Sequence, residues 1–337
     1  MRSKFSLLVL LIILGIGFWW IVSHTGYVIL NPRDQDVTVK DLLYEKYSFE
    51  RLVERGGIAS KIEIAGNKFY YQSEGRRISG EINLPSRPGL EGVVVMARGY
   101  VDKEIYKTGI GTHNAAKYFA EQGYVTLAPD FSGYGESDPE DPNALGARLS
   151  KPVEILDLIA SIRANNDLPL QGAETPIFLW GHSNGGQIML SVAEIIGKKA
   201  PSLPAQASLR GQSSQVRGLT LWAPVSKPFP YNILYYTDDA SDSGKWLRGK
   251  VAEFEQDYDV FNYSIDRYLD WINIPVQIHQ GDMDEAVPKI WSDNLAKVLK
   301  EKEKEVSYFV YPGANHNMKP GWNKVVERDV SFFTSLN

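Results

Sequence analysis

The chain has 337 residues, 43% of them hydrophobic and 23% charged, so it is large enough for a sizeable core and unlike a disordered or fibrous protein. Its net charge is −5 and its body has no dense run of Lys and Arg, so no nucleic-acid partner is expected. Because cysteine is absent, disulfides, thiolate metal sites and cysteine nucleophiles are excluded.

An apolar run from Phe5 to Val22, broken only by Ser6, follows the basic residues Arg2 and Lys4. As a helix it would be about 27 Å long, close to the hydrocarbon thickness of a bilayer. We therefore expect one uncleaved transmembrane helix within residues 1–30, with a cytoplasmic N-terminus and the rest of the chain outside. The alternatives are a cleaved signal peptide, which would give a secreted protein, and a buried helix.

The segment from Val37 to Gly57 has apolar residues at helical spacing and ends on two glycines, which predicts a short helix in a linker of residues 31–60. Three short β-branched or alternating runs follow, separated by turn residues, and predict an antiparallel leading edge of a sheet. These runs are Lys61–Ala65, Phe69–Ser73 and Arg77–Leu84.

Beyond Pro88, apolar strands alternate with helices, which predicts a mostly parallel, doubly wound sheet in an α/β domain of residues 61–337. The predicted strands are Gly92–Ala97, Tyr124–Ala128, Ile177–Trp180, Arg217–Trp222, Pro275–His279 and Val306–Tyr311. The predicted helices are His113–Gln122, Pro152–Asn165, Gly185–Ile196, Ile290–Glu303 and Lys324–Ser335. The piece Pro201–Gln215, rich in Pro, Ser and Gln, is expected to be an exposed loop.

A long insertion interrupts this alternation between the fourth and fifth of these strands. It is rich in Tyr, Phe, Trp and Asp, with helical patterns near Lys245–Gln256 and Asp266–Trp271. A loop of about 50 residues needs its own structure or a function. We expect a small helical cap, about residues 225–272, over the carboxyl edge of the sheet, where ligands bind in such folds.

The sequence Gly181-His-Ser-Asn-Gly185 follows an apolar strand directly and precedes an amphipathic helix. This G-x-S-x-G pattern in a strand–turn–helix context is typical of a nucleophile elbow, which presents the serine hydroxyl at a helix N-terminus. It predicts Ser183 as a nucleophile. The alternative is an ordinary glycine-rich turn.

A serine nucleophile needs a base, and His316 is the predicted one because it lies in a glycine-bearing loop after the last strand. The other four histidines precede the serine or close a strand. Three carboxylates compete to orient the base. Asp284 is favoured, Asp282 is better placed to bond turn amides, and Glu285 is the third alternative.

An oxyanion needs two donors, and we expect the backbone amides of Asn184 and Tyr100, the latter in the loop after the strand Gly92–Ala97. Tyr100 is otherwise a packing tyrosine after a turn glycine. The glycine-rich loop Asp130–Ser137 lacks a phosphate-binding pattern and is expected to be structural. The histidines have no metal-ligand spacing, so neither a metal nor a cofactor is predicted.

With these motifs, the chain from about Lys61 to Asn337 resembles the α/β-hydrolases and is similar to the catalytic domains of the prolyl oligopeptidase family and related esterases. The resemblance rests on four segments, Gly181–Gly185, Gly281–Pro288, Gly313–His316 and Asp130–Ser137. In that family the residues that match Ser183, Asp284 and His316 form the catalytic triad.

Two features depart from the family pattern. The roughly 60 residues before the first strands are too few for the β-propeller of full-length prolyl oligopeptidases. The His-Gly pair common at the oxyanion loop is Arg98-Gly99 here, which puts a familiar side-chain role in question.

The resemblance implies a serine hydrolase that cleaves a peptide or ester bond through an acyl-serine. A prolyl-oligopeptidase-like peptidase is favoured, and a carboxylesterase or lipase-like esterase is the alternative. A different class of function would be an inactive binding module displayed on a membrane. The expected partners are a peptide or acyl-ester substrate and a lipid bilayer.

Overall fold

The computed structural model describes residues 43–86, 89–164, 175–198, 216–238 and 240–337. The predicted anchor within residues 1–30 and the loop Pro201–Gln215 lie outside these residues. Within the described ranges, none of the helices combines the length and apolar character needed to cross a bilayer.

A short helical segment precedes the first strand, within the predicted linker. It consists of the 3-10 helix η1 (Glu45–Tyr47) and the helix α2 (Phe49–Arg55). The hydroxyl of Ser48 caps α2 by accepting from the amide of Arg51, and Gly56 ends the helix with a φ of 60°. The predicted helix is therefore confirmed from residue 45, with its stop at the two glycines.

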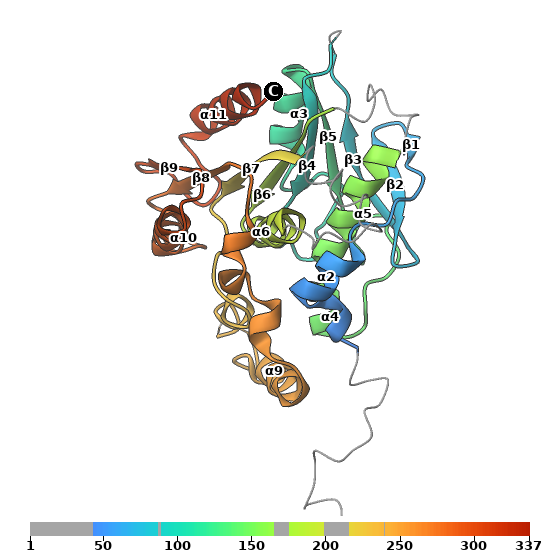
Figure 1. Cartoon of the computed structure of the whole chain (residues 1–337), viewed down its shortest axis with the longest axis vertical. Helices are drawn as coiled ribbons and strands as arrows, with labels where there is room; N and C mark the ends of the chain where they lie inside the picture. The colour runs from blue at the N-terminus through green and yellow to red at the C-terminus, as the bar shows by residue number, and fades with distance from the viewer. Residues whose placement is uncertain (1–42, 87–88, 165–174, 199–215, 239) are drawn as a thin grey trace, which may run out of the picture. The chain divides into compact units, whose positions relative to one another are not determined.

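The core of the molecule is a nine-stranded sheet in the order β1-β2-β3-β5-β4-β6-β7-β8-β9 (Figure 1). Its strands are β1 (Glu63–Ala65), β2 (Lys68–Ser73), β3 (Arg76–Asn83), β4 (Gly92–Ala97), β5 (Tyr124–Pro129), β6 (Ile177–His182), β7 (Val216–Trp222), β8 (Val276–Gly281) and β9 (Val306–Tyr311). Strands β1 to β3 are antiparallel, β3 pairs with β5 antiparallel, and all later pairs are parallel. The predicted leading edge and the mostly parallel sheet are confirmed.

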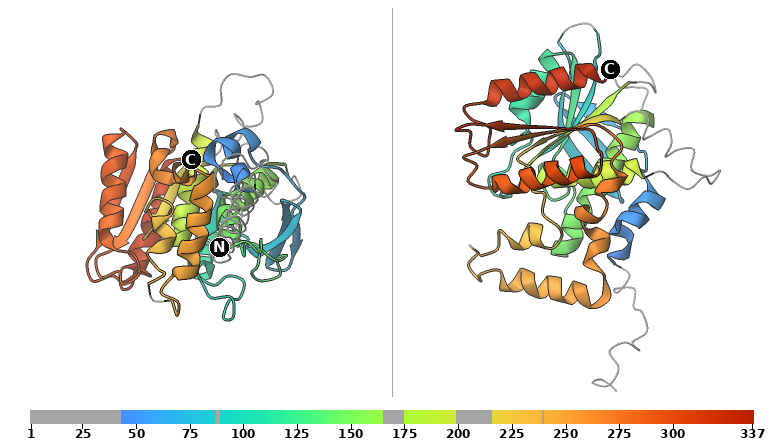
Figure 2. Two further views of the ribbon diagram at one scale, coloured as in Figure 1. Left: turned by 90° about the horizontal axis from the view of Figure 1, so that it is seen from below. Right: turned by 60° about the vertical axis from the view of Figure 1, so that its left-hand side comes forward.

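Helices cover both faces of the sheet, as Figure 2 shows for the last two helices. They are α3 (His113–Glu121), α4 (Ala144–Leu149), α5 (Lys151–Ala164), α6 (Asn184–Gly197), α10 (Lys289–Glu301) and α11 (Trp322–Ser335). Strand β4 shows how the faces divide: Val93 and Val95 pack into the cluster with α5, α6 and α10, whereas Val94 and Met96 pack with α3 and α11. Both sides of a central strand are thus buried, which explains its continuous apolar run.

The insertion between β7 and β8 is largely helical. It contains α8 (Tyr231–Leu234), α9 (Lys245–Asp257) and the 3-10 helices η3 (Val260–Tyr263), η4 (Ile265–Arg267) and η5 (Leu269–Trp271). The two predicted helical patterns correspond to α9 and to the last two 3-10 turns. Helix α4 was not predicted, because it is short and contains a glycine; its start depends on the Asn143 side chain, which accepts from two amides.

Candidate active site

The turn between β6 and α6 holds Ser183 in an unusual backbone conformation, with φ 57° and ψ −121°. Two hydrogen bonds fix it: the Ser183 amide donates to the Trp222 carbonyl at 2.9 Å, and its carbonyl accepts from the Val225 amide at 3.0 Å. A Cβ at Gly185 would lie 2.0 Å from the carbonyl oxygen of Ala97. Because β4 passes so close, a residue with a side chain would not fit at position 185, and Gly185 is required there.

Asp284 and His316 meet between the loops that follow β8 and β9. The Nδ1 atom of His316 lies 3.0 Å from each carboxylate oxygen of Asp284. The same carboxylate accepts from the amides of Ala286 and Val287 at 2.9 and 2.8 Å, and from the side-chain amide of Gln280 at 2.8 Å. Because these donors converge on a fully buried carboxylate, the Asp284 side chain is held in one position.

The protonation state of this pair follows from its contacts. Burial alone would raise the pKa of Asp284, but hydrogen bonds from His316, Val287 and Ala286 hold that pKa below its ordinary value. An ionised carboxylate only accepts hydrogen bonds, so the facing Nδ1 of His316 carries the proton. The Nε2 atom of His316 is then an acceptor, and it bonds to no other residue in the described part of the chain.

The loop of His316 also lies against the turn of Ser183. The ring of His182 is 4.7 Å from the ring of His316, centroid to centroid, and its Nε2 donates to the His316 carbonyl at 3.0 Å. The hydroxyl of Ser183 makes no hydrogen bond with any residue that the structure describes. The structure therefore places Asp284 in direct contact with His316, and Ser183 directly after the residue that His316 touches.

The two predicted oxyanion donors flank one cavity. The amides of Tyr100 and Asn184 donate to no acceptor among the described residues, and both residues line this cavity. A Cβ at Gly99 would lie 3.0 Å from the Cβ of Ser183, so the loop after β4 passes directly beside the serine. Two amides without acceptors beside a serine can stabilise a negatively charged oxygen.

Arg98 fixes the backbone of the loop after β4 through its buried guanidinium. Its guanidinium is buried and donates to the carbonyls of Gly99 at 2.9 Å and Asp130 at 3.1 Å. It also lies over the rings of Tyr106 and Tyr134, 4.3 and 4.1 Å from their centroids. The side chain thus anchors the loop backbone, and it does so together with the glycine-rich loop that begins at Asp130.

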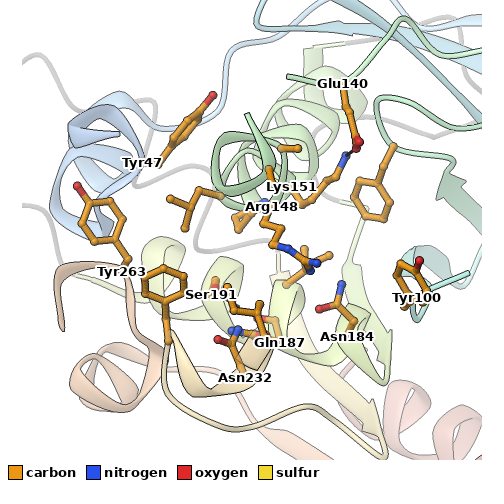
Figure 3. Close-up of a pocket in the computed structure, with 18 of the residues that line it drawn as sticks. Tyr47, Tyr100, Glu140, Arg148, Lys151, Asn184, Gln187, Ser191, Asn232 and Tyr263 are labelled. Atoms are coloured by element: carbon orange, nitrogen blue, oxygen red, sulfur yellow. Dashed lines mark hydrogen bonds and ion pairs between the residues drawn. The ribbon is translucent and has the colours of Figure 1, made fainter. Parts of the chain in front are cut away.

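The cavity has a volume of about 360 Å³. Its walls come from η1 and α2, the loop after β4, α4 and the start of α5, the first turns of α6, and the insertion after β7 (Figure 3). This volume is within the range of about 300 to 1,000 Å³ that is usual for small-molecule sites. The predicted helical insertion therefore forms one wall of the cavity, and the segment before the sheet forms another.

Several contacts of the His316 loop were not predicted from the sequence. His182 was set aside because it precedes the serine, yet it holds the backbone of His316. The carboxylate of Glu285 accepts from the His316 amide at 3.2 Å, and that of Asp282 accepts from the Gly313 amide at 2.6 Å. These carboxylates shape the loop, whereas Asp284 contacts the ring. In the sequence, the one sign of these contacts is that Asp282 and Glu285 lie in the same short loop as Asp284.

A family model and a curated protein are each similar to part of this chain. Residues 91–253 match the model of a family described as serine aminopeptidase, S33. The human protein ABHD12B is 22% identical over 226 residues, which are 64% of this chain and 55% of that protein. The chain therefore spans about half the length of this curated relative.

Solved structures with the same fold include esterases and a peptidase. Est1E from Butyrivibrio proteoclasticus has a TM-score of 0.52 at 19% identity, over 80% of this chain and 99% of that one. A puromycin-hydrolyzing peptidase of Mycobacterium tuberculosis has a TM-score of 0.54 at 17% identity, over 78% of this chain and 37% of that one. The esterase Est2 of Thermogutta terrifontis has a TM-score of 0.52 at 18% identity, over 83% of this chain and 95% of that one. Together with the sheet order, these similarities show that the chain has the α/β-hydrolase fold.

Proposed function

We propose that the protein is a serine hydrolase that cleaves an ester or peptide bond through an acyl-serine. Ser183 is the nucleophile, His316 the general base and Asp284 the group that orients the base. The observation that carries this proposal is the contact of Asp284 with Nδ1 of His316, which leaves Nε2 free on a loop packed against the Ser183 turn.

In the first half-reaction the Oγ of Ser183 attacks the substrate carbonyl carbon while its proton passes to Nε2 of His316. The amides of Tyr100 and Asn184 hold the negative oxygen of the tetrahedral intermediate. When the intermediate collapses, the bond to the leaving group breaks, and His316 gives its proton to the departing alcohol or amine. The serine is left acylated.

In the second half-reaction water attacks the acyl-serine, His316 takes a proton from it, and collapse releases the acid and restores the serine hydroxyl. Asp284 stabilises the imidazolium that forms in both halves. The hydrogen bond between Ser183 and His316 forms when substrate is bound, since such bonds are often long in free enzymes and shorten in the substrate complex.

The first test is covalent labelling of the purified full chain in detergent with a fluorophosphonate probe. We expect labelling of one serine, Ser183, and its loss in Ser183→Ala. Ser191→Ala is the matched control, because Ser191 lines the cavity next to the Ser183 turn and its hydroxyl donates to the carbonyl of Gln187. Labelling that persists in folded Ser183→Ala, or is absent from the wild type, contradicts the proposal.

Peptide and ester substrates are distinguished by a second measurement. The peptidase interpretation is supported by the S33 family match and the puromycin-hydrolyzing structure, and the esterase interpretation by Est1E and Est2. We propose the prolyl-oligopeptidase-like peptidase as the first candidate and a carboxylesterase as the second. A panel of 4-nitrophenyl esters and aminoacyl 4-nitroanilides, compared by kcat/KM, decides between them.

We also propose that the apolar run Phe5–Val22 anchors the protein in a bilayer and places the catalytic body on the extracytoplasmic side. The support is its length, its basic flank and its pair of tryptophans. The test is membrane association after an alkaline wash. The double variant Leu11→Arg, Leu14→Arg is expected to release the protein, while Ser3→Arg, which adds charge outside the run, is not.

A further inference from the structure

The cavity beside Ser183 carries an excess of positive charge in a chain whose net charge is −5. Four basic and two acidic side chains line it: Arg98, Lys103, Arg148, Lys151, Glu104 and Glu140. The positive charge is local, so it reflects the arrangement of this cavity rather than the overall composition.

Three of the four basic groups already have partners. The guanidinium of Arg98 is used by the loop after β4. Lys103 pairs with Glu140 at 2.5 Å, and Lys151 donates to the carbonyl and hydroxyl of Ser132, both at 3.0 Å. Glu140 also lies 3.9 Å from Lys151, so its charge is shared between the two lysines.

Arg148 is the remaining basic group, and it has neither an ion pair nor a side-chain hydrogen bond within the described part of the chain. Figure 3 shows it in the cavity between Lys151 and Asn184. Arg148 is an exposed residue, and desolvation of its guanidinium by the surrounding protein lowers the pKa of that group. A partly desolvated cation without an anion is poised to bind one.

Asn232 gives a second, independent sign that the cavity takes a polar ligand. It lies in α8 and also lines the cavity, the residue is 7% exposed, and its Oδ1 atom is buried without a hydrogen-bond partner among the described residues. A buried polar atom without a partner costs free energy unless a ligand or water satisfies it. Because Oδ1 is an acceptor, it needs a donor such as water or the N–H of a peptide substrate, and the carboxylate of a ligand does not satisfy it.

The position of the cavity indicates which half of a substrate enters it. The leaving group has to reach Nε2 of His316, since His316 protonates it. The cavity is lined by the oxyanion candidates Tyr100 and Asn184 and lies beside the Ser183 turn, on the side away from His316, whereas Ser183, Asp284 and His316 themselves are outside its lining. The half of the substrate in this cavity is therefore the acyl half.

We propose that Arg148 binds a carboxylate carried by the acyl half of the substrate, so that the enzyme prefers half-esters of dicarboxylic acids, or peptides with an acidic residue before the cleaved bond, over neutral acyl groups. This inference rests on the proposed hydrolase function. A charge-assisted hydrogen bond to the guanidinium predicts a preference of about 10- to 100-fold in kcat/KM.

The experiment compares the mono-4-nitrophenyl ester of adipic acid with 4-nitrophenyl hexanoate on the full chain in detergent. The two acyl chains have the same number of carbons, so their ratio of kcat/KM isolates the terminal charge, and each rate is corrected for spontaneous hydrolysis. We expect the wild type to favour the adipate. In Arg148→Gln the ratio should fall at least tenfold, whereas Arg148→Lys should keep part of it because it keeps the charge.

Reversing the charge at position 148 gives a variant that should gain a preference for a positively charged acyl group. Arg148→Glu is expected to favour the 4-nitrophenyl ester of 6-aminohexanoic acid over the adipate. The matched control is Arg217→Gln, because Arg217 is an exposed arginine on β7 outside the cavity lining, and its ratio should equal the wild-type ratio. Circular dichroism and fluorophosphonate labelling confirm that each variant is folded.

The outcomes separate this inference from the proposed function. A wild-type ratio of one or less, or a ratio unchanged in Arg148→Gln, overturns the role of Arg148 while hydrolysis itself stands. If neither ester is cleaved and the probe does not label Ser183, the hydrolase function fails instead. Should Arg148→Gln not fold, competitive inhibition of the wild type by adipate against hexanoate gives the same decision, with no preference for adipate overturning the inference.

Discussion

Two histidine–carboxylate pairs of this molecule differ in their exposure and in the number of ring nitrogens that are bonded. In the pair His316–Asp284 the ring bonds through Nδ1 only, and the His316 side chain is 13% exposed. In the pair His279–Asp329 both residues are fully buried, and both ring nitrogens are bonded: Nδ1 to the Tyr311 hydroxyl at 2.7 Å and Nε2 to Asp329 at 3.0 Å.

The difference shows that a carboxylate beside a histidine does not define a catalytic base. Asp329 also accepts from Thr220, Trp222 and Gln277, so it acts as the acceptor for a polar cluster inside the core, behind β7 and β8. His316 instead keeps one nitrogen free beside the Ser183 turn. We therefore expect changes in the first pair to affect catalysis and changes in the second to affect stability.

The largest expected effect comes from removing the free nitrogen. In His316→Ala, kcat should fall by about 10⁶-fold, because loss of the base removes most of the advantage of the serine. The melting temperature should stay close to the wild-type value, since the ring is at the edge of the fold. Asn317→Ala, a change of an exposed side chain in the same loop, is the control. More than one per cent of wild-type kcat in folded His316→Ala would contradict the assignment.

The next effect tests the carboxylate. In Asp284→Asn, kcat should fall by about 10⁴-fold, because an amide can donate to Nδ1 and so favours the wrong tautomer of the ring. Asp282→Asn and Glu285→Gln should each cost much less, since these carboxylates contact backbone amides only. Steady-state kinetics on the three variants rank the acids, and a larger loss in Asp282→Asn or Glu285→Gln would reassign the role.

The two pairs also show what the sequence could predict. Ser183, His316 and Asp284 were predicted because each lies in a short local pattern whose position relative to the strands has a defined meaning. His279 was not chosen as the base because it closes a strand, and in the structure both of its ring nitrogens have buried partners. Its actual partner, Asp329, lies in α11, and no pattern near either residue indicates this contact.

Features that depend on distant segments were not predictable. The contacts that Arg98 makes with Tyr106, Tyr134 and the Asp130 carbonyl involve residues that come together only after folding. The cavity likewise combines α2 with α6 and the insertion. A periodic apolar pattern fixes the face that a helix buries, but it does not state which helix lies opposite.

A third prediction concerns the buried pair. Asp329→Ala should lower the free energy of unfolding by about 3 to 5 kcal/mol, because it leaves several buried donors without their acceptor. The kcat per folded molecule should change little. Urea denaturation followed by fluorescence measures the free energy of unfolding. Active-site titration gives the concentration of active molecules, from which the kcat per folded molecule is obtained. Glu327→Ala, an exposed change two residues earlier in α11, is the control. A loss of kcat in Asp329→Ala without loss of stability would remove the distinction between the pairs.

The smallest expected effect concerns His182, which is buried and touches His316. Burial and the neighbouring His316 ring lower the pKa of His182 to about 4, from an ordinary value of 6.5. Between these two pH values the unfolded chain binds a proton at this position and the folded chain does not, so stability falls as the pH falls from 6.5 towards 4.

For one group shifted this far, the loss approaches about 3 kcal/mol near pH 4. His182→Gln removes this titration while keeping a side-chain donor for the His316 carbonyl. The free energies of unfolding of the two proteins should therefore converge as the pH is lowered, because the carboxylates that also titrate in this range are common to both. Urea titrations at pH 7, 5.5 and 4.5 measure the difference, and parallel curves would mean that His182 is protonated in the folded protein as easily as in the unfolded one.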